Sequence, residues 1–218
     1  MASIVAYIEL RAGKVTRPSR YAVSRARRVA DSAGATVYAL LTVGPLPQAE
    51  IDQLAAEISA AGADRILCSS ADALAGPPLN LSHGPLLAQI AEHLRPLLFL
   101  FPAGGAGSEL GPPLAVRLGA AYMADASIDI VPEDRAPEPA SQRIVLTRWR
   151  AARDGLRRID VGDFERPVVA SLTIGPVPEA LGEQSAEVEM LSCPEPAPGG
   201  PRRLGSEPDP DGAVEVES

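Results

Sequence analysis

The stretch "LFLFPAGGAGSELGPPLAVRLG", residues Leu98 to Gly119, runs a short apolar segment into a glycine-rich turn and then into a helical pattern. Leu97–Phe101 has the length and composition of a buried strand. Leucines recur beyond the turn at the spacing of one helix face, at positions Leu110, Leu114 and Leu118. A buried strand followed closely by a helix is the repeating unit of a parallel α/β sheet, so this stretch decides the fold class.

The same alternation continues on both sides of this stretch. Further strands are expected at Ser3–Glu9, Thr36–Val43, Arg65–Cys68 and Ser127–Val131. Amphipathic helices are expected over residues 18–33, 51–61 and 86–94, the first two closed by Gly34 and Gly62. The pattern predicts a doubly wound α/β domain, with a mostly parallel sheet covered by helices on both faces.

The pattern changes beyond Pro132. Three β-like runs follow, Ile144–Trp149, Leu156–Val161 and Val168–Ile174, and they lie too close together for helices between them. We expect hairpin pairing added to the sheet, or a small β extension. The predicted organisation is therefore one domain over residues 1–192, with the β extension at 143–192, and a disordered, acidic, Pro- and Gly-rich tail at 193–218.

The composition excludes several classes of function. The net charge of −8 argues against nucleic acid as a partner. No apolar stretch approaches a membrane span, and the amino-terminal segment resembles a strand more than a signal peptide, so a cytoplasmic protein is expected. Cys68 and Cys193 stand alone, without the spacing of a zinc or redox motif, and no metal site is predicted.

The glycine-rich turn has two interpretations. Glycines between a strand and a helix can hold a phosphate at the helix N-terminus, which makes weak candidates for cofactor binding of Gly104, Gly105, Gly107 and Ser108. The spacing, however, is neither the dinucleotide fingerprint nor a P-loop, and Glu109 would bring a carboxylate toward the phosphate position. A plain strand-to-helix turn is the favoured interpretation.

Two pairs of polar residues are weaker candidates for a functional role than the glycine-rich turn. His83 and His93 are expected on a loop and on a helix, where a solvated or capping role is favoured over a catalytic one. Asp125 and Asp129 bracket the start of the expected fifth strand and could form a general-base pair, but turn and capping roles are favoured. No catalytic residue is assigned.

One tryptophan stands among arginines. Trp149 lies between Arg148 and Arg150, and these three residues are candidates for contact with a partner or a flat ligand. A tryptophan that covers the edge of a sheet would give the same pattern, and this interpretation is favoured.

Several segments resemble, in order, the N-terminal domain of the electron transfer flavoprotein alpha subunit. "ELGPPLAVRLG" (residues 109–119) and "YMADASIDI" (122–130) are similar to the family's helix and the "VAD" segment that follows it. "AGADRILCSSADAL" (61–74) and the opening "YIELRAGKV" are similar to two earlier family segments. "IVLTRW" (144–149) and "RPVVASLTIGP" (166–176) match less well, since the family's glycine loop and an expected arginine are replaced, the arginine by Ile174.

The resemblance implies an adenine-nucleotide-hydrolase-like fold and a non-catalytic role in electron transfer. The chain would pack against a beta-type subunit, which carries AMP, and against a separate FAD-binding domain, and relay electrons from a dehydrogenase. The family's C-terminal domain, which supplies most of the FAD site, has no counterpart in the motifs of this sequence. FAD is therefore expected in the assembled system and not on this chain alone.

Two alternatives stay open. The chain could be a stand-alone adenine-nucleotide-binding module, because related folds bind nucleotides at the strand ends. It could also be a degenerate, non-catalytic interaction domain that keeps the fold and has lost the family's functional residues.

Overall fold

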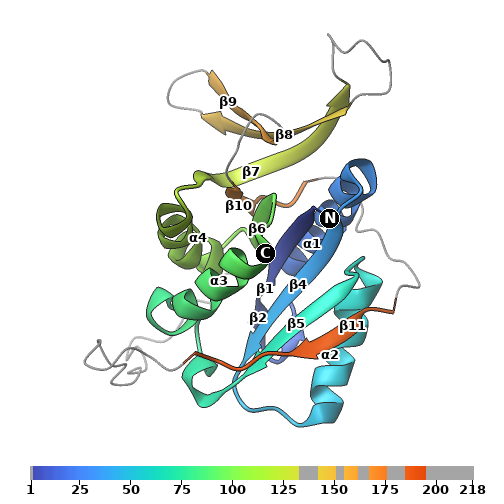
Figure 1. Ribbon diagram of the computed structural model, residues 1–218, viewed down its shortest axis with the longest axis vertical. Helices are drawn as coiled ribbons and strands as arrows, with labels where there is room; N and C mark the ends of the chain where they lie inside the picture. The colour runs from blue at the N-terminus through green and yellow to red at the C-terminus, as the bar shows by residue number, and fades with distance from the viewer. Residues whose placement is uncertain (1, 133–141, 151–154, 162–166, 176–184, 195–218) are drawn as a thin grey trace, which may run out of the picture.

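A nine-stranded sheet between two layers of helices forms the body of the protein (Figure 1). This computed structural model describes residues 2–132, 142–150, 155–161, 167–175 and 185–194. The strands are β1 (Ser3–Ile8), β2 (Leu10–Arg11), β3 (Lys14–Val15), β4 (Thr36–Val43), β5 (Arg65–Ser70), β6 (Leu98–Pro102), β7 (Ala121–Pro132), β8 (Gln142–Arg150), β9 (Gly155–Asp160), β10 (Val168–Leu172) and β11 (Glu187–Met190). The helices are α1 (Arg17–Ala33), α2 (Gln48–Ala60), the short 3₁₀ helix η1 (Asp72–Leu74), α3 (Asn80–Leu94) and α4 (Gly105–Leu118).

The strand order is β11-β5-β4-β1-β6-β10-β7-β8-β9, and β2 and β3 form a separate hairpin. All neighbours from β11 to β7 are parallel, whereas β7, β8 and β9 pair in antiparallel fashion. The chain builds outward from β1 toward β5 and then returns to place β6 on the other side of β1. The topological switch point of the sheet therefore lies between β1 and β6, which confirms the doubly wound α/β fold.

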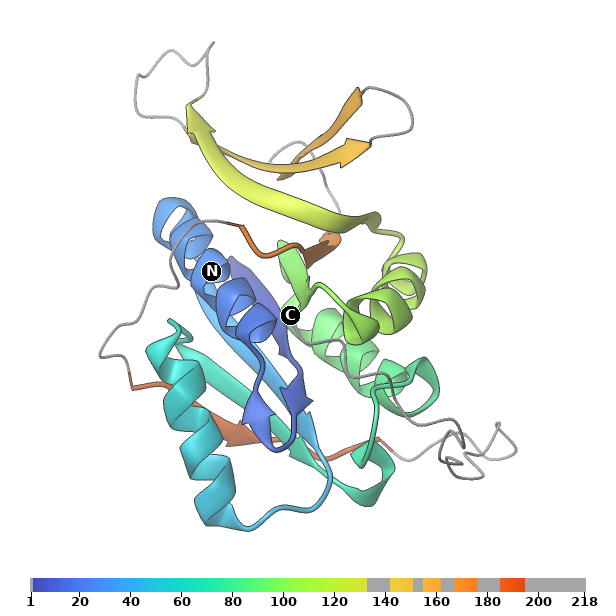
Figure 2. The same ribbon diagram turned by 180° about the vertical axis from the view of Figure 1, so that it is seen from behind.

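The two faces of the sheet carry separate apolar cores. α1 and α2 cover one face, seen in front in Figure 2, and alternate residues of the strands pack under them, such as Ile4, Ala6 and Ile8 of β1. α3 and α4 cover the other face, where Val5 and Tyr7 of the same strand are buried. All six residues of β1 are buried, as expected for a central parallel strand, which explains its continuous apolar sequence.

Two strands differ from the sequence expectation. Val168–Leu172 (β10) is not part of a hairpin or β extension: it lies between β6 and β7 and is parallel to both. Its continuous apolar sequence, buried throughout, suits this central position. β7 is a 12-residue strand, longer than Ser127–Val131, because its first half pairs with β10 and its second half with β8.

The β8–β9 hairpin is present as expected. In Figures 1 and 2 it lies with β7 at the top of the view, above the parallel part of the sheet. The domain boundary between residues 192 and 193 stays a prediction. The expected disordered tail lies, from residue 195 onward, outside the described residues.

Candidate functional site

The switch point opens into a cavity of about 780 Å³ at the carboxyl ends of β1 and β6. The β2–β3 hairpin and the first residues of α1 form one wall, and the N-terminus of α4 forms the other. The charged and glycine residues that line it are Glu9, Arg11, Lys14, Arg17, Gly104 and Gly105. One carboxylate thus shares the cavity with three cations and with a helix N-terminus, which is electrostatically positive.

Glu9 is one of the charged residues of this cavity that the sequence did not single out, together with Arg11, Lys14 and Arg17. It directly follows β1, and its Oε2 lies 3.7 Å from the place where a Cβ of Gly104 would stand. Burial raises the pKa of its carboxyl group above the ordinary value. Its position one residue beyond a fully buried strand is the signal that could have found it, because ligands of α/β sheets bind at strand ends.

The four glycine-loop candidates do not act as one group. Gly104 (φ 136°) precedes α4, whereas Gly105, Gly107 and Ser108 belong to its first turn, so the helix starts earlier than expected. A Cβ on Gly107 would lie 2.6 Å from the Pro102 carbonyl oxygen and 2.8 Å from Ser171 Cβ. Gly107 therefore lets α4 pack closely on β6 and β10. Gly104 and Gly105 line the cavity, and a binding role for them stays a prediction.

Glu109 does not occupy the anion position that the sequence suggested. Its Oε1 accepts a hydrogen bond of 3.0 Å from the Asn80 backbone N–H at the start of α3. The carboxylate thus joins the N-termini of α3 and α4, and α3 has no side-chain cap of its own at Leu79. Within the switch-point cavity, the carboxylate that lies beside the N-terminus of α4 is that of Glu9.

The two histidines lie on one helix. His83 belongs to α3 and is buried, with 2% exposed, which corrects the expected solvated loop position. Its Nδ1 lies 2.8 Å from Ser82 Oγ, and burial lowers its pKa to about 4. The imidazole is thus neutral at pH 7. His93 is exposed near the end of α3 and lines a second cavity of about 410 Å³, between this helix and the β5–β11 edge.

Asp125 and Asp129 do not form a general-base pair. Each has its own arginine: Asp125 Oδ2 lies 3.3 Å from Arg148, and Asp129 Oδ1 lies 3.1 Å from the buried Arg25. Arg25 also donates to the carbonyl oxygen of Ile128, so it ties α1 to β7. Both aspartates lie within β7, where Asp125 (φ 50°) marks a register shift against β10.

The partner-contact candidates lie on β8, close to its end. The Arg148 side chain is 39% exposed while it pairs with Asp125. The side chains of Trp149 and Arg150 lie outside the described part of the structure, although their backbones pair with Leu156 and Gly155 of β9. A partner contact for the three residues stays a prediction.

Comparison with known families identifies a match over most of the chain. The model of the electron transfer flavoprotein domain matches residues 4–196, which include the four long helices and all of the nine-stranded sheet except Ser3. The chain belongs to the electron transfer flavoprotein domain family. No curated protein matches the sequence.

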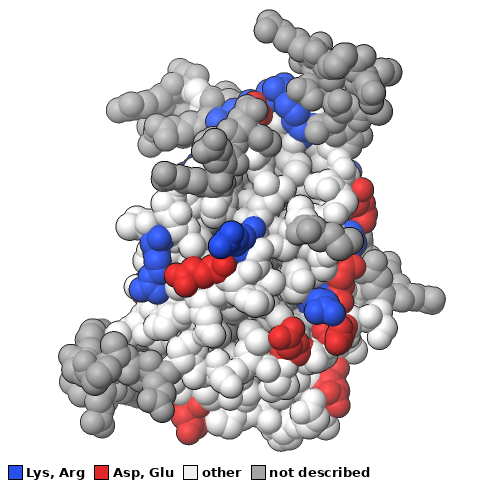
Figure 3. Space-filling model, in the orientation of Figure 1, with Lys and Arg blue, Asp and Glu red and all other residues white. Residues whose placement is uncertain are grey.

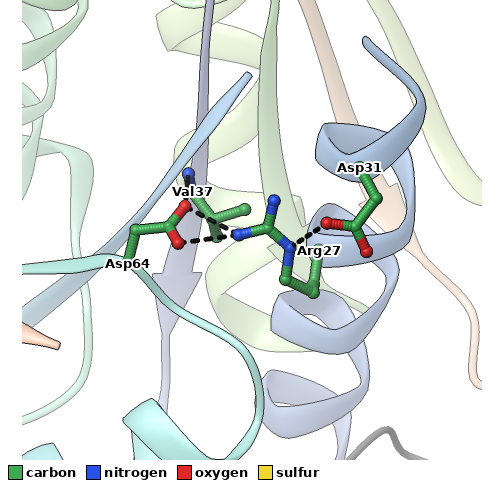
Figure 4. Close-up of polar contacts among 4 residues, drawn as sticks. All are labelled: Arg27, Asp31, Val37 and Asp64. Carbon is green, nitrogen blue, oxygen red and sulfur yellow. Dashed lines mark hydrogen bonds and ion pairs between the residues drawn. The ribbon is translucent and has the colours of Figure 1, made fainter. Parts of the chain in front are cut away.

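A cluster of hydrogen bonds around Asp64 gives a structural reason for one of the family-like segments of this electron transfer flavoprotein domain (Figure 4). In the segment that begins "AGAD", Asp64 receives hydrogen bonds of 2.8 Å on both carboxylate oxygens from Arg27 Nη1, and of 2.8 Å on Oδ2 from the Val37 backbone N–H. A Cβ on Gly62 would lie 2.9 Å from Arg27 Cβ. These residues join α1, β4 and β5, and their role is structural.

Neither cavity of the electron transfer flavoprotein domain suits FAD. The switch-point cavity brings the Glu9 carboxylate to the side of α4 where a pyrophosphate would need only donors and cations. The second cavity is lined by the C-terminal half of α3 and by β11 residues that include Glu189, and no helix N-terminus reaches it. That FAD is held outside this chain stays a prediction.

Two further findings concern the described residues. Among them, no group of histidine, cysteine and acidic side chains is placed to hold a metal ion. None of the helices in the described ranges combines the length and the apolar character that a membrane span requires.

Proposed function

We propose that this chain is a non-catalytic subunit or accessory domain of an electron transfer flavoprotein system. The observation that carries the proposal is the family match over residues 4–196, on a sheet that keeps the doubly wound order. In this role the chain packs against a beta-type subunit and a separate FAD-binding domain, and the assembly relays electrons from a dehydrogenase. The alpha-type identity rests on the resemblance of segments such as residues 109–119.

FAD supplies the electron-carrying group of the assembly. This chain acts as a scaffold against which the other parts of the assembly pack. The lack of fit between FAD and the two cavities supports a flavin held elsewhere in the assembly. Where AMP is present, the proposal assigns it to the beta-type partner. The cytoplasmic location likewise remains part of the proposal.

Co-expression with a beta-type subunit from the same organism tests the proposal. The tagged chain is purified alone and with the co-expressed subunit, and the two samples are compared by size-exclusion chromatography with light scattering. The proposal expects a stoichiometric complex of higher mass. A chain that stays monomeric beside a folded beta-type subunit would contradict it and would favour a degenerate domain with another role.

A second candidate function is the binding of a small anion such as a nucleotide at the switch point. The cavity favours it because Arg11, Lys14 and Arg17 line the same space as Gly104 and Gly105. The Glu9 carboxylate opposes it through like-charge repulsion. Calorimetric titration of the natural chain and of the variant Glu9→Gln with ATP and AMP tests whether the cavity binds a nucleotide and whether Glu9 opposes that binding. Heat from the variant alone would identify Glu9 as the barrier, and no heat from either would exclude the function.

A further inference from the structure

Two adjacent cations lie on the β2–β3 hairpin, in the wall of the switch-point cavity. Arg11 and Lys14 are directly opposed across the two strands, and both are exposed. Like charges at opposed positions destabilise an antiparallel pair. Neither side chain forms an ion pair with another residue of the described ranges. An anionic group that pairs with both would therefore stabilise the hairpin.

The rest of the cavity favours a ligand with several anionic groups. Arg17 and the N-terminus of α4 add positive charge to the lining, and Glu9 is its one carboxylate. Glu9 Oε2 lies 3.7 Å from the place where a Cβ of Gly104 would stand, so it lies beside the wall that α4 forms. An extended polyanion can pair with the hairpin cations without placing a charge next to Glu9, whereas a phosphate at the N-terminus of α4 cannot.

The chain itself contains such a polyanion. Residues 204–218 contain five acidic residues and no basic residue. The acidic residues are Glu207, Asp209, Asp211, Glu215 and Glu217. We call residues 207–217 the acidic segment. Its charge is opposite to that of the cavity lining, which holds three cations and one carboxylate.

The chain leaves the sheet at the edge where the cavity opens. β11, β5, β4, β1 and β6 are all parallel, so their carboxyl ends share this edge. β11 is three places from β1 in the strand order, which corresponds to about 15 Å at the usual strand spacing. The 12 residues between Pro194, which follows β11, and Glu207 can span up to about 40 Å when extended. The acidic segment can therefore reach the cavity.

The surface around β11 does not offer a competing site. Glu187 and Glu189 of β11 are exposed, and in Figure 3 acidic side chains predominate where Figure 1 places β5, β11 and α2. Arg65, the basic residue of this edge, is already paired with Glu187 at 2.8 Å. This surface repels the acidic segment, while the cavity attracts it.

We infer that the switch-point cavity is an intramolecular docking site for the acidic segment, whose carboxylates pair with Arg11 and Lys14. The docked segment competes with any other anion for the cavity. The inference is independent of the proposed function, because it concerns contacts within one chain.

The test uses Lys14, which is the only lysine of the chain. A water-soluble carbodiimide joins a lysine amine to a neighbouring carboxylate with loss of water. The full chain is treated at low concentration, digested with trypsin and analysed by mass spectrometry. We expect a product that joins residues 12–20, which contain Lys14, to residues 204–218. Its yield should fall about fivefold in 0.5 M NaCl, where charges are screened beyond about 4 Å.

A variant that keeps Lys14 and the whole acidic segment tests the pairing. Arg11→Gln should lower the yield about threefold, because it removes one of the two hairpin cations. Arg28→Gln, an exposed substitution on α1, is the matched control and should change the yield by less than about 1.5-fold. Loss of the free peptide 204–218 measures the yield in every sample, and far-UV circular dichroism confirms that each variant folds.

Three results would overturn the inference. The first is a Lys14 product confined to carboxylates of residues 2–132, such as Glu9, which would show that the amine reacts and the acidic segment does not reach it. The second is a yield that responds neither to NaCl nor to Arg11→Gln. The third is a product that joins labelled to unlabelled chains in a mixture with ¹⁵N-labelled protein, which would identify a second copy as the source of the segment.

Discussion

Arg27 of α1 donates from one nitrogen to both carboxylate oxygens of Asp64 at 2.8 Å, across the amino end of the sheet (Figure 4). The pair is mostly buried on the arginine side, where 16% of the side chain is exposed, against 34% for Asp64. Asp64 also accepts from the Val37 N–H, so one carboxylate fixes a helix and the start of a strand together. The contact links elements that are 37 residues apart in the chain.

This relationship predicts a large effect for a single substitution. Asp64→Ala should lower the free energy of unfolding by about 2 kcal/mol, because it leaves Nη1 of a mostly buried guanidinium and a backbone N–H without their acceptor. Asp31→Ala removes an exposed i,i+4 partner of the same arginine and should change the free energy of unfolding by less than about 0.5 kcal/mol. Urea unfolding of both variants measures the difference. Equal losses would show that Asp64 has no special role.

Two glycines at the start of α4 are expected to respond differently to substitution, because Gly107 packs against the sheet and Gly105 lines the cavity. Gly107→Ala should lower the free energy of unfolding by about 1–3 kcal/mol, since its Cβ would meet the Pro102 carbonyl and Ser171. A Cβ at Gly105 would have no neighbouring atom within 4 Å, so Gly105→Ala should leave the free energy of unfolding unchanged or raise it by up to about 1 kcal/mol. Thermal unfolding of the two variants measures this contrast, and a stable Gly107→Ala chain would contradict the packing role.

Glu9 should make the folded chain less stable at neutral pH. Because burial raises its pKa in the folded state, that state binds the proton more tightly than the unfolded chain does. The penalty is complete above the folded pKa, shrinks as the pH falls through it, and is absent below the unfolded pKa. Glu9→Gln should therefore raise the free energy of unfolding at pH 7, with a difference that narrows toward acid.

Urea unfolding between pH 7 and pH 4 measures this difference. Glu92→Gln, an exposed substitution on α3, is the matched control. A Glu9→Gln chain less stable than the natural one at pH 7 would show that the carboxylate has a stabilising partner instead.

His83 should give the opposite pH dependence. Burial lowers its pKa to about 4, below the ordinary value of 6.5, so its stabilising contribution is present above about pH 6.5 and is lost as the pH falls toward 4. The loss should amount to roughly 2–3 kcal/mol in the natural chain and be absent in His83→Gln. His93→Gln, on the exposed side of the same helix, should keep the natural pH profile, as urea unfolding at pH 7, 5.5 and 4.5 can show.

Regular alternation made most of the fold predictable. Strands such as Thr36–Val43 and helices such as α1, which ends before the left-handed Gly34, follow directly from apolar spacing and a glycine stop. The position of β10 could not be read in the same way. A short apolar run specifies a buried strand but not its neighbours, and only the assembled sheet shows that Val168–Leu172 lies between β6 and β7.

The candidate site was harder to predict because it depends on contacts between distant segments. The glycines at 104–107 suggested a single loop, yet Gly107 serves packing while Gly105 faces the cavity. Glu109 was expected near the anion position, but it bonds to Asn80, 29 residues away. Glu9 belongs to no recognisable motif. It lies in the cavity because β1, which it follows, is the neighbour of β6 in the sheet.

The visible absorption spectrum of the purified assembly tests the central proposal most directly. The chain is purified alone, with the beta-type subunit, and with that subunit and an FAD-binding domain, each with FAD supplied during refolding or growth. We expect flavin absorbance in a complex that retains this chain and none in the chain by itself. A colourless chain that joins no flavin-containing complex would contradict its role in electron transfer.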